Sequence, residues 1–440
     1  MSAAKTIRDA VHGDIRLSGR AMRVVDTRPV QRLRGIKQLG MTNLVYPSAV
    51  HTRFEHSLGT AWLAQRILRA LEESCNRRID PHDRELVVVA CLLHDVTHIP
   101  FGHTIEDERR VFPRHDRDVR RLRYFLRQPD LAAALDALGI AAEVERLLLV
   151  KDPLAEERPF VSQLVSHTIC ADLLDYLARD NYFCGLRQHY DDRIFRSFRL
   201  AGDRLVVDLE KQGFLRQDVL SELIHLLRIR YNLTERVYFH HAKVAAGVMI
   251  SRAVELAVAE GLTITDLYEL GDDSVLFLLR SRFGGSRAIA ELLAKLQRRA
   301  LYRRCYVLTD EITGDDRATL VRRYHENFRK ARDRAERAIA GELGIEDHQV
   351  IVYCPPARMQ LKEAEVLVRL GEGPPRSLAD LSNPEVASLQ QKYGKLWKFT
   401  VLLDPSCAGP RLGRAGEICE RYFGLKNQLE LDRRGQLSLF

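Results

Sequence analysis

Apolar residues recur at intervals of three and four along most of the first 300 residues, which predicts amphipathic helices. The clearest segments are 60–71, 84–95, 161–178, 217–236 and 243–259. Polar and apolar residues instead alternate in 194–200 and 204–209, on either side of Ala201-Gly202-Asp203. Alternation around a glycine turn predicts a β-hairpin. We therefore expect residues 1–300 to form a multi-helical domain with one short hairpin.

The last third of the chain has a different pattern. Short runs typical of strands occupy 304–308, 349–353, 366–370 and 397–403. The longest helical segment between them is 317–343, and the glycines and prolines of 371–377 predict a loop. These features predict a smaller α+β domain over 301–425 and a tail over 426–440. The fold class of the whole chain is therefore expected to be mainly α.

The composition narrows the class of protein. The chain has 440 residues, of which 46% are hydrophobic, enough for a large core. No run approaches the roughly 20 apolar residues of a membrane span, and residues 1–9 lack the apolar segment of a signal peptide. The eight cysteines form no C-x-x-C pair, as in proteins whose thiols stay reduced. We expect a cytoplasmic protein with no membrane association.

The formal net charge of the chain is +8. Such a charge favours anionic partners, such as nucleotides, phosphates or nucleic acid, without choosing among them. Part of the excess lies in 297–304 and 317–337. Because acidic residues are interspersed in the second segment, we interpret it as a solvated helix face rather than as a nucleic-acid groove.

Four residues in helical segments have the chemistry of metal ligands: His56, the adjacent pair His94-Asp95, and Asp172. The pair ends the apolar run 86–93, so both groups are expected at the end of a buried helix. A charge there is costly unless it is paired or bound to a metal. Two imidazoles and two carboxylates suit iron, manganese, zinc, nickel or cobalt, with positions left for water and phosphate oxygen. Magnesium could assist at the phosphates.

More ionisable residues follow this pair closely: His98, His103, Glu106 and His115. A metal can polarise a phosphoryl oxygen and generate hydroxide near neutral pH, and a histidine can protonate the leaving oxygen. A single histidine on an apolar face is more often a core residue. Here the pair, the downstream histidines and His56 coincide, so the combination indicates a hydrolytic metal site.

These segments resemble the deoxynucleoside triphosphate triphosphohydrolases of the HD superfamily, in particular the branch that in animals carries an added SAM domain. The matching motifs are Ile36-Lys37-Gln38-Leu39-Gly40, His51-Thr52-Arg53-Phe54-Glu55-His56, Leu93-His94-Asp95, Pro100-Phe101-Gly102-His103 and 172–180. The match begins at Lys5, is strong to about residue 250 and continues more weakly to about residue 405. It implies an HD-domain core for the helical region.

The resemblance implies a role for each matching residue. The catalytic metal would be held by His56, His94, Asp95 and Asp172, and His103 would protonate the leaving 5′-oxygen. The remaining assignments are Arg53, His98, His115 and Arg230 for the phosphates, Gln38 and Asp180 for the 3′-hydroxyl, and Tyr176 and Tyr238 for the sugar. An aromatic wall formed by Tyr238 would leave a ribose 2′-hydroxyl no space and no partner.

Two positions depart from the family pattern. Glu106 stands where the family carries an aspartate beside the general acid, so its role should persist with altered geometry. Leu173 stands where the animal enzymes carry a lysine next to the last metal ligand, so a triphosphate contact is lost. This loss keeps a nucleotide monophosphatase or phosphodiesterase of the same superfamily as an alternative.

The resemblance also implies a second nucleotide site, for a guanine nucleotide, at a subunit interface. The matching positions are Lys5, Asp26, Gln31, Arg34 and Phe54. An aspartate can accept from the guanine N1–H and amine, and an arginine can donate to O6. A bound activator would then favour a homo-oligomer, either a dimer or a tetramer. In the alternative, Asp26 pairs locally and Arg34 forms a structural salt bridge.

The last five residues, Gln436-Leu437-Ser438-Leu439-Phe440, resemble the short peptide with which bacterial replication and repair proteins dock on the DNA sliding clamp. Leu439 and Phe440 would be its apolar anchors. The alternative is an amphipathic tail that packs on its own domain. A nucleotide-regulated protein that binds nucleic acid or a clamp is therefore a candidate of another class.

The retained metal and acid–base residues favour an enzyme over a purely regulatory protein. We therefore expect a mainly α HD-domain metallohydrolase. Its preferred reaction would convert a deoxynucleoside triphosphate into a deoxynucleoside and inorganic triphosphate.

Overall fold

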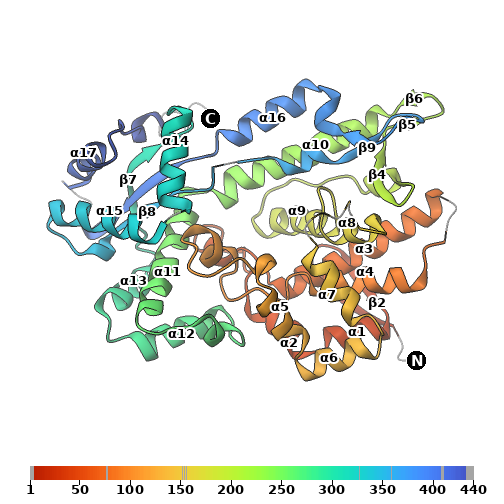
Figure 1. Ribbon diagram of the computed structural model, residues 1–440, viewed down its shortest axis with the longest axis horizontal. Coiled ribbons are helices and arrows are strands. Elements are labelled where there is room, and N and C mark those ends of the chain that lie inside the picture. Colours follow the sequence, from red (N-terminus) through yellow and green to blue (C-terminus); the bar gives the residue numbers. More distant parts are fainter. Residues whose placement is uncertain are drawn as a thin grey trace.

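The computed structural model describes residues 4–75, 78–150, 152, 154, 156–326, 328–357, 359–407 and 411–432. As the sequence predicts, the fold is mainly α, with a helical N-terminal region and a smaller α+β C-terminal region (Figure 1). The helices of the first region are α1 (Gly19–Val25), α2 (Arg28–Gln31), α3 (Arg53–Cys75), α4 (Pro81–Leu93), α5 (Val119–Leu126), α6 (Pro129–Asp136), α7 (Ala141–Leu149), α8 (Pro159–Val165), α9 (Ala171–Phe183), α10 (Gln217–Leu233), α11 (His241–Ala259), α12 (Asp272–Phe283) and α13 (Arg287–Gln297). Strands β1 (Lys5–Asp9) and β2 (Gly13–Leu17) form an antiparallel ribbon before them.

Helices α3, α4 and α9 form the centre of the helical region. Helix α4 begins where the Asp80 side chain accepts a hydrogen bond from His82 N, with Pro81 in the first turn. Its residues 86–93 are all buried, so its end lies inside the protein. Helix α9 approaches α3 at Gly59, where a Cβ would overlap Asp175 Oδ1. A glycine at this position therefore allows the buried Asp175 to lie against α3.

The segment 161–178, predicted as one helix, is two helices. Helix α8 ends at Val165, and α9 begins after Cys170, whose backbone is extended (φ −125°, ψ 177°). The polar residues 166–168 lie between them, and such residues are weak helix formers. The break places Asp172 in the first turn of α9. The sequence pattern joined the two helices because apolar residues flank the polar segment on both sides.

Two other predicted helices are also interrupted, each by a π-helical turn. Helix α10 stops at Leu233, and residues Thr234–Tyr238 form a π-helical turn. The segment 317–343 divides into α14 (Gly314–Val321), a π-helical turn (Arg322–Glu326) and α15 (Phe328–Leu343). Turns of this kind often occur at functional sites, and Tyr238 lies at the end of the first one.

The predicted hairpin is present and joins the two regions. Strands β3 (Phe198–Ala201) and β4 (Arg204–Asp208) pair antiparallel, while 192–197 is 3-10 helix instead of strand. Strand β4 also pairs in parallel with β9 (Leu367–Arg369), which pairs with β10 (Arg376–Ser377). The end of the predicted loop 371–377 is thus a short strand. Strands β5 (Glu210–Lys211) and β6 (Phe214–Leu215) form a separate ribbon.

The C-terminal region has a core of its own. Strand β11 (Phe399–Leu403) lies between β7 (Arg303–Leu308) and β8 (Val350–Tyr353), antiparallel to both. Helices α15 and α17 (Arg411–Phe423) pack on this sheet around the buried Trp397. Residues 361–393 instead contribute side chains to the core of the helical region. In Figure 1, α16 (Pro384–Gly394) and β9 accordingly lie along α10 and β4.

The remaining expectations concern membranes and thiols. Among the described residues, no helix is long and apolar enough to cross a lipid bilayer. All eight cysteines are free, and six of them are buried. Cys91 and Cys170, close in the chain to the metal-ligand candidates, are among the buried ones.

Candidate metal centre and active site

Three of the four predicted metal ligands converge at the meeting point of α3, α4 and α9. One donor atom from each of His56, His94 and Asp172 lies within 4.8 Å of the others. The Nε2 atom of His56 is 3.1 Å from His94 Nε2 and 3.0 Å from Asp172 Oδ1. Two imidazole nitrogens and a carboxylate oxygen turned toward one point are a donor set that fits a divalent transition metal.

The fourth predicted ligand, Asp95, lies beside this group. Its Oδ1 is 3.6 Å from His94 Nε2, and its Oδ2 is 3.8 Å from His56 Nε2. Arg53 Nη1 donates to Asp95 Oδ2 at 2.5 Å. Burial alone would raise the pKa of Asp95, but Arg53 and His94 outweigh it and hold the pKa well below its usual range. Asp95 is therefore an anion beside the metal position.

Each imidazole of the centre is fixed through its other ring nitrogen. The Nδ1 of His56 lies 2.7 Å from Asp175 Oδ2, and the Nδ1 of His94 lies 2.7 Å from Cys91 O. These contacts leave both Nε2 atoms facing the metal position, which is the usual arrangement behind histidine ligands. Burial would lower the pKa of His56, but hydrogen bonds to Asp172 and Asp175 raise it to about 10.

Sequence reasoning missed the role of Asp175. Its side chain is fully buried and contacts His12 Nε2 at 2.6 Å and Arg179 Nε at 2.8 Å. Arg179 also donates to Asp9 at 2.9 Å. A signal was present, because Asp175 follows Asp172 by three residues and so lies on the same face of α9.

A second group of imidazoles lies next to the metal centre. One ring nitrogen each of His98, His103 and His115 lies within 4.8 Å of the others. The rings of His98 and His115 have their centroids 3.6 Å apart and are tilted by 32° relative to each other. His98 is fully buried, whereas the side chain of His103 is 47% exposed. The predicted general acid is therefore the member of this group that solvent and substrate can reach.

Two carboxylates of the π-helical turn Thr104–Glu108 hold this group. Glu106 Oε2 lies 2.9 Å from His115 Nδ1 but 3.9 Å from His103 Nδ1. Asp107 Oδ2 is closer to His103, at 3.2 Å. Arg121, also missed by sequence reasoning, donates to Glu106 Oε1 at 2.7 Å in a fully buried ion pair. Glu106 thus contacts mainly His115, and Asp107 is the carboxylate beside the predicted acid.

The residues predicted to bind the sugar also lie together. Asp180 accepts from Tyr238 Oη at 2.6 Å, and its other oxygen lies 2.8 Å from His51 Nε2. The backbone of Gln38 donates to His51 O at 2.9 Å, and Gln38 Oε1 is buried without a hydrogen-bond partner among the described residues. His51, which sequence reasoning gave no role, therefore connects the two predicted 3′-hydroxyl ligands.

Arg230, predicted to bind phosphate, lies between two tyrosines. Its guanidinium carbon is 5.4 Å from the ring centre of Tyr176 and 5.2 Å from that of Tyr238. Its Nε donates to Glu363 Oε1 at 3.1 Å. Glu363 comes from the C-terminal region, 133 residues away in the chain, so no local sequence pattern could have indicated it. This acid competes with any phosphate for Arg230.

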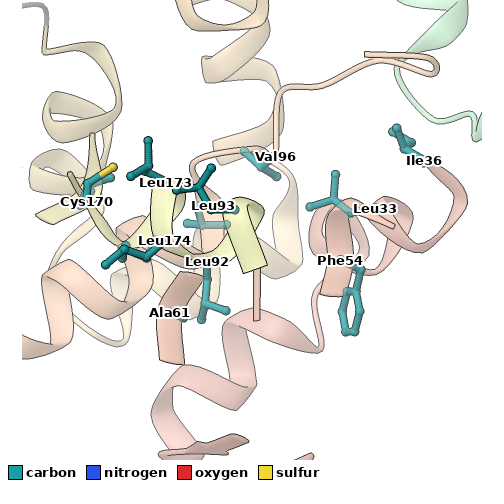
Figure 2. Close-up of a cluster of buried hydrophobic side chains, with 14 of the residues drawn as sticks. Leu33, Ile36, Phe54, Ala61, Leu92, Leu93, Val96, Cys170, Leu173 and Leu174 are labelled. Carbon is teal, nitrogen blue, oxygen red and sulfur yellow. The ribbon is translucent and has the colours of Figure 1, made fainter. Parts of the chain in front are cut away.

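Leu173, the departure beside the last metal ligand, is a core residue. Its side chain is 4% exposed. Figure 2 draws it in the same cluster of buried apolar side chains as Leu93 and Cys170. It is therefore an apolar packing residue of the core. Residues Gln436 to Phe440, the predicted clamp-binding peptide, lie outside the described residues.

The five residues predicted for the activator site make contacts in two groups. Lys5 Nζ lies 3.7 Å from Asp26 Oδ2, and both side chains are 59% exposed. Gln31 Oε1 accepts from Arg34 Nε at 2.8 Å, and the Arg34 guanidinium lies 3.6 Å over the Phe54 ring. Asp26 thus pairs locally, and Arg34 stacks on an aromatic ring instead of forming a salt bridge.

Comparison with known proteins agrees with an HD-domain metal centre. A model of the HD domain matches residues 53–180, and a model of the HD associated region matches residues 192–433. The uncharacterized protein MJ1154 of Methanocaldococcus jannaschii is 33% identical over 308 residues, which cover 68% of this chain and 59% of that protein. Deoxynucleoside triphosphate triphosphohydrolase SAMHD1 of Homo sapiens is 28% identical over 355 residues, or 70% of this chain and 56% of that protein. The chain thus spans somewhat more than half the length of these relatives.

A solved structure supports the fold over nearly the whole chain. A phosphohydrolase from Bacteroides thetaiotaomicron superposes with a TM-score of 0.68 and 23% identity, covering 91% of this chain and 99% of that one. The likeness at this identity concerns the fold alone. The matched HD domain contains all four predicted metal ligands, and the associated region accounts for more than half of the chain. The chain therefore belongs to the HD-domain phosphohydrolases that carry an HD-associated region.

Proposed function

We propose that this phosphohydrolase cleaves deoxynucleoside triphosphates at the α-phosphorus and releases a deoxynucleoside and inorganic triphosphate. One observation carries the proposal. Asp172, Tyr176 and Asp180 are spaced four residues apart on α9, so they lie in a row on one helix face. The row leads from the metal centre to the Asp180–Tyr238 pair. This arrangement matches a nucleotide whose α-phosphate lies at the metal and whose sugar lies beyond it.

The metal would be held by His56, His94, Asp95 and Asp172. A divalent ion bound there supplies Lewis-acid chemistry toward phosphate oxygen and water. Arg53 keeps Asp95 ionised, and Asp175 keeps the His56 ring oriented.

His103 is proposed as the general acid. Asp107, 3.2 Å from its Nδ1, orients the ring, so that Nε2–H can donate to the leaving 5′-oxygen. His115, held by the buried Glu106, is proposed to contact the phosphates together with Arg53, His98 and Arg230. For Arg230 this requires that a phosphate displaces Glu363.

Sugar recognition is proposed to depend on Asp180, Gln38 and the two tyrosines. The Asp180 carboxylate can accept from a 3′-hydroxyl, and the buried Gln38 Oε1 has a free acceptor position. The Tyr238 ring is held by its hydrogen bond to Asp180. A ring fixed in this way excludes a 2′-hydroxyl sterically, which favours deoxyribose over ribose.

The products of the reaction test this proposal. Purified protein supplied with each deoxynucleoside triphosphate should release intact triphosphate and deoxynucleoside. Release of pyrophosphate and monophosphate would contradict cleavage at the α-phosphorus with a nucleoside leaving group. Turnover of monophosphates or cyclic nucleotides alone would instead support the monophosphatase or phosphodiesterase alternative. The reason for this alternative is Leu173, which replaces a lysine that contacts the triphosphate in the animal enzymes.

We further propose that the group of Lys5, Asp26, Gln31, Arg34 and Phe54 binds a guanine nucleotide that activates a homo-oligomer. The exposed Asp26 and Lys5 offer an acceptor and a cation, and the stacked Arg34 offers a donor. Hydrolysis of single deoxynucleotides and of mixtures tests whether a guanine nucleotide acts as an activator. Activation of one nucleotide's hydrolysis by a guanine nucleotide, lost in Asp26→Ala, supports this proposal, whereas full activity on every single nucleotide contradicts it.

A basic groove favours a second candidate function, that of a nucleic-acid-binding regulator. A cavity of about 370 Å³ between α14 and α15 is lined by Arg322, Arg323, Lys330 and Arg334. Such a groove fits a phosphate backbone, whose binding would weaken steeply with salt concentration. Binding of single-stranded and double-stranded DNA measured against salt decides whether this surface is used.

A further inference from the structure

The carboxylate of Asp180, proposed to bind the 3′-hydroxyl, is held by two side chains from different parts of the chain. It is 2% exposed, and its Oδ2 accepts from Tyr238 Oη at 2.6 Å. Its Oδ1 lies 2.8 Å from Nε2 of His51, which is 129 residues earlier in the chain. An ionised carboxylate can accept about four hydrogen bonds, so these two donors leave room for a third. A buried carboxylate held in this way can accept from a substrate hydroxyl.

The ring of His51 is buried against the end of α9. It stacks on Phe183 with the ring centroids 4.6 Å apart, and Phe183 and Asp180 lie three residues apart on one face of that helix. Because a carboxylate only accepts, the proton of the contact to Asp180 lies on His51 Nε2. The other nitrogen, Nδ1, is buried and makes no hydrogen bond to a described residue. An apolar side chain would fill this space without an unpaired nitrogen, so the bond to Asp180 accounts for a histidine here.

The backbone of the same residue holds Gln38, the other proposed 3′-hydroxyl ligand. His51 O accepts from Gln38 N at 2.9 Å, and Arg53 N donates to Ile36 O at 2.9 Å. These two bonds pair the segment of Gln38 with that of His51 at the point where α3 begins. His51 therefore contacts Asp180 through its ring and Gln38 through its backbone. One residue thus fixes the two proposed ligands relative to each other.

We propose that His51 is a positioning residue that makes the site select a sugar with a free 3′-hydroxyl. Its Nε2–H fixes one oxygen of Asp180, so that the remaining acceptor positions of the carboxylate meet the 3′-hydroxyl. The His51 side chain is fully buried, so it acts through Asp180 and does not touch the nucleotide. This inference rests on the proposed function, which places the sugar of a deoxynucleotide at Asp180. The ligand that the site rejects is the 3′-deoxy analogue, because it brings no donor to the buried carboxylate.

Binding of two nucleotide analogues tests this role without turnover. Both are thymidine triphosphate analogues in which a methylene group replaces the 5′-oxygen, so that the bond proposed to break is absent. One analogue keeps the 3′-hydroxyl, and the other has hydrogen there. Titration calorimetry on the metal-loaded protein gives the two Kd values, and wild-type protein should bind the 3′-hydroxyl form more tightly. In His51→Phe, which keeps a ring against Phe183 but removes the donor, this preference should fall by about 10-fold, because a hydrogen bond to a charged group is no longer positioned.

Two further variants separate the hydrogen bond from the packing of the ring. His51→Gln carries its amide nitrogen the same number of bonds from Cα as His51 Nε2, so it can donate to Asp180 and should restore most of the preference. His348→Phe is the matched control. His348 is also a buried histidine, and its Nε2 lies 2.9 Å from Glu291 Oε2. Because this pair has no contact with the proposed sugar ligands, the control should keep the wild-type preference.

The outcomes separate this inference from the proposed function. Equal weakening of both analogues in His51→Phe means that the residue only supports the fold, and it overturns the inference. Equal binding of both analogues to wild-type protein overturns it too, because the site then does not recognise the 3′-hydroxyl. If His51→Phe does not fold, His51→Leu, which also lacks the donor, takes its place. Failure of wild-type protein to release intact triphosphate from any deoxynucleoside triphosphate refutes the proposed function, and the binding preference still decides the role of His51.

Discussion

Glu336 Oε1 accepts a hydrogen bond from Arg109 Nη1 at 2.8 Å, and neither side chain is exposed to solvent. The pair joins α15 of the C-terminal region to the segment that connects the π-helical turn with His115. Arg332 of the same helix donates to Arg109 O at 2.6 Å, and Arg329 donates to Val111 O at 2.9 Å. The C-terminal region thus holds the backbone between Glu106 and His115.

Replacing Glu336 by glutamine should destabilise the protein and loosen this segment. The change leaves the buried Arg109 with Glu255 as its remaining acidic partner, and breaking a buried pair costs about 3 kcal/mol. Denaturant unfolding measures the loss. Arg337→Gln is the matched control. Arg337 is the next residue of α15, and its ion pair with Asp347 is exposed. An exposed ion pair contributes little to stability. Equal unfolding free energies of the two variants would show that the buried ion pair contributes no more to stability than the exposed one.

The same network should give the protein an acid-sensitive stability. Burial alone would raise the pKa of Glu255, but Arg109 and Arg252 outweigh it and lower the pKa to about 2. The folded pKa lies below the unfolded value of roughly 4.3, so this stabilisation is complete above that value and is lost as the pH falls toward 2.

Unfolding free energies measured between pH 7 and pH 2 test this expectation. The Glu255→Gln variant should be less stable at pH 7 and should lose less stability on acidification than the wild type. Glu260→Gln, an exposed change at the end of the same helix, should follow the wild-type curve. Parallel curves for all three proteins would contradict the assignment.

The metal ligands and the network around them differ in how far the sequence could predict them. His56, His94 and Asp172 stand in motifs with characteristic neighbours, so their convergence followed from the family pattern. The pairing of Arg109 with Glu336 spans 227 residues, and no local periodicity relates two such positions. Glu363 and Arg230 are 133 residues apart in the chain. Contacts of this kind depend on how the C-terminal region packs, which only the folded structure shows.

The errors in the predicted helix boundaries can be traced to the local sequence pattern. The hairpin and the sheet strands were predicted because alternation and β-branched residues are strong signals. The break between α8 and α9 was missed because the apolar pattern continues on both sides of 166–168. The consequence is functional, since this break brings Asp172 to the first turn of α9 and so to the metal centre.

Asp175→Asn should weaken metal binding without removing a ligand. Asp175 holds His56 through Nδ1 at 2.7 Å, and loss of such a contact typically lowers metal affinity by about 10- to 100-fold. Metal retained after dialysis against a graded chelator series measures the change. Asp192→Asn, which alters an exposed pair with Arg66, should retain wild-type affinity. Unchanged affinity in Asp175→Asn would mean that α3 packing alone orients the ring.

The hydrogen bond from Tyr238 to Asp180 gives the sharpest test of sugar recognition. Tyr238→Phe keeps the ring but leaves one oxygen of the buried Asp180 without its donor at 2.6 Å. An unsatisfied buried acceptor costs about 1–3 kcal/mol of folding free energy, and Asp180 also loses a contact that positions it for the 3′-hydroxyl. We therefore expect kcat/KM for a deoxynucleotide to fall by roughly 10-fold for each 1.4 kcal/mol of positioning that is lost. The preference for deoxyribose over ribose should persist, because the wall that excludes the 2′-hydroxyl is still present.

Tyr238→Ala removes that wall and should lower the ratio of kcat/KM for a deoxynucleotide to that for the matching ribonucleotide. The ratio is the informative quantity, because a general loss of folding or metal would reduce both values together. Tyr182→Phe changes a tyrosine of α9 that is 52% exposed, and it should alter neither value. If Tyr238→Ala keeps the wild-type ratio while Tyr238→Phe loses activity, discrimination depends on Asp180 and its hydrogen bonds, and the ring has no part in it.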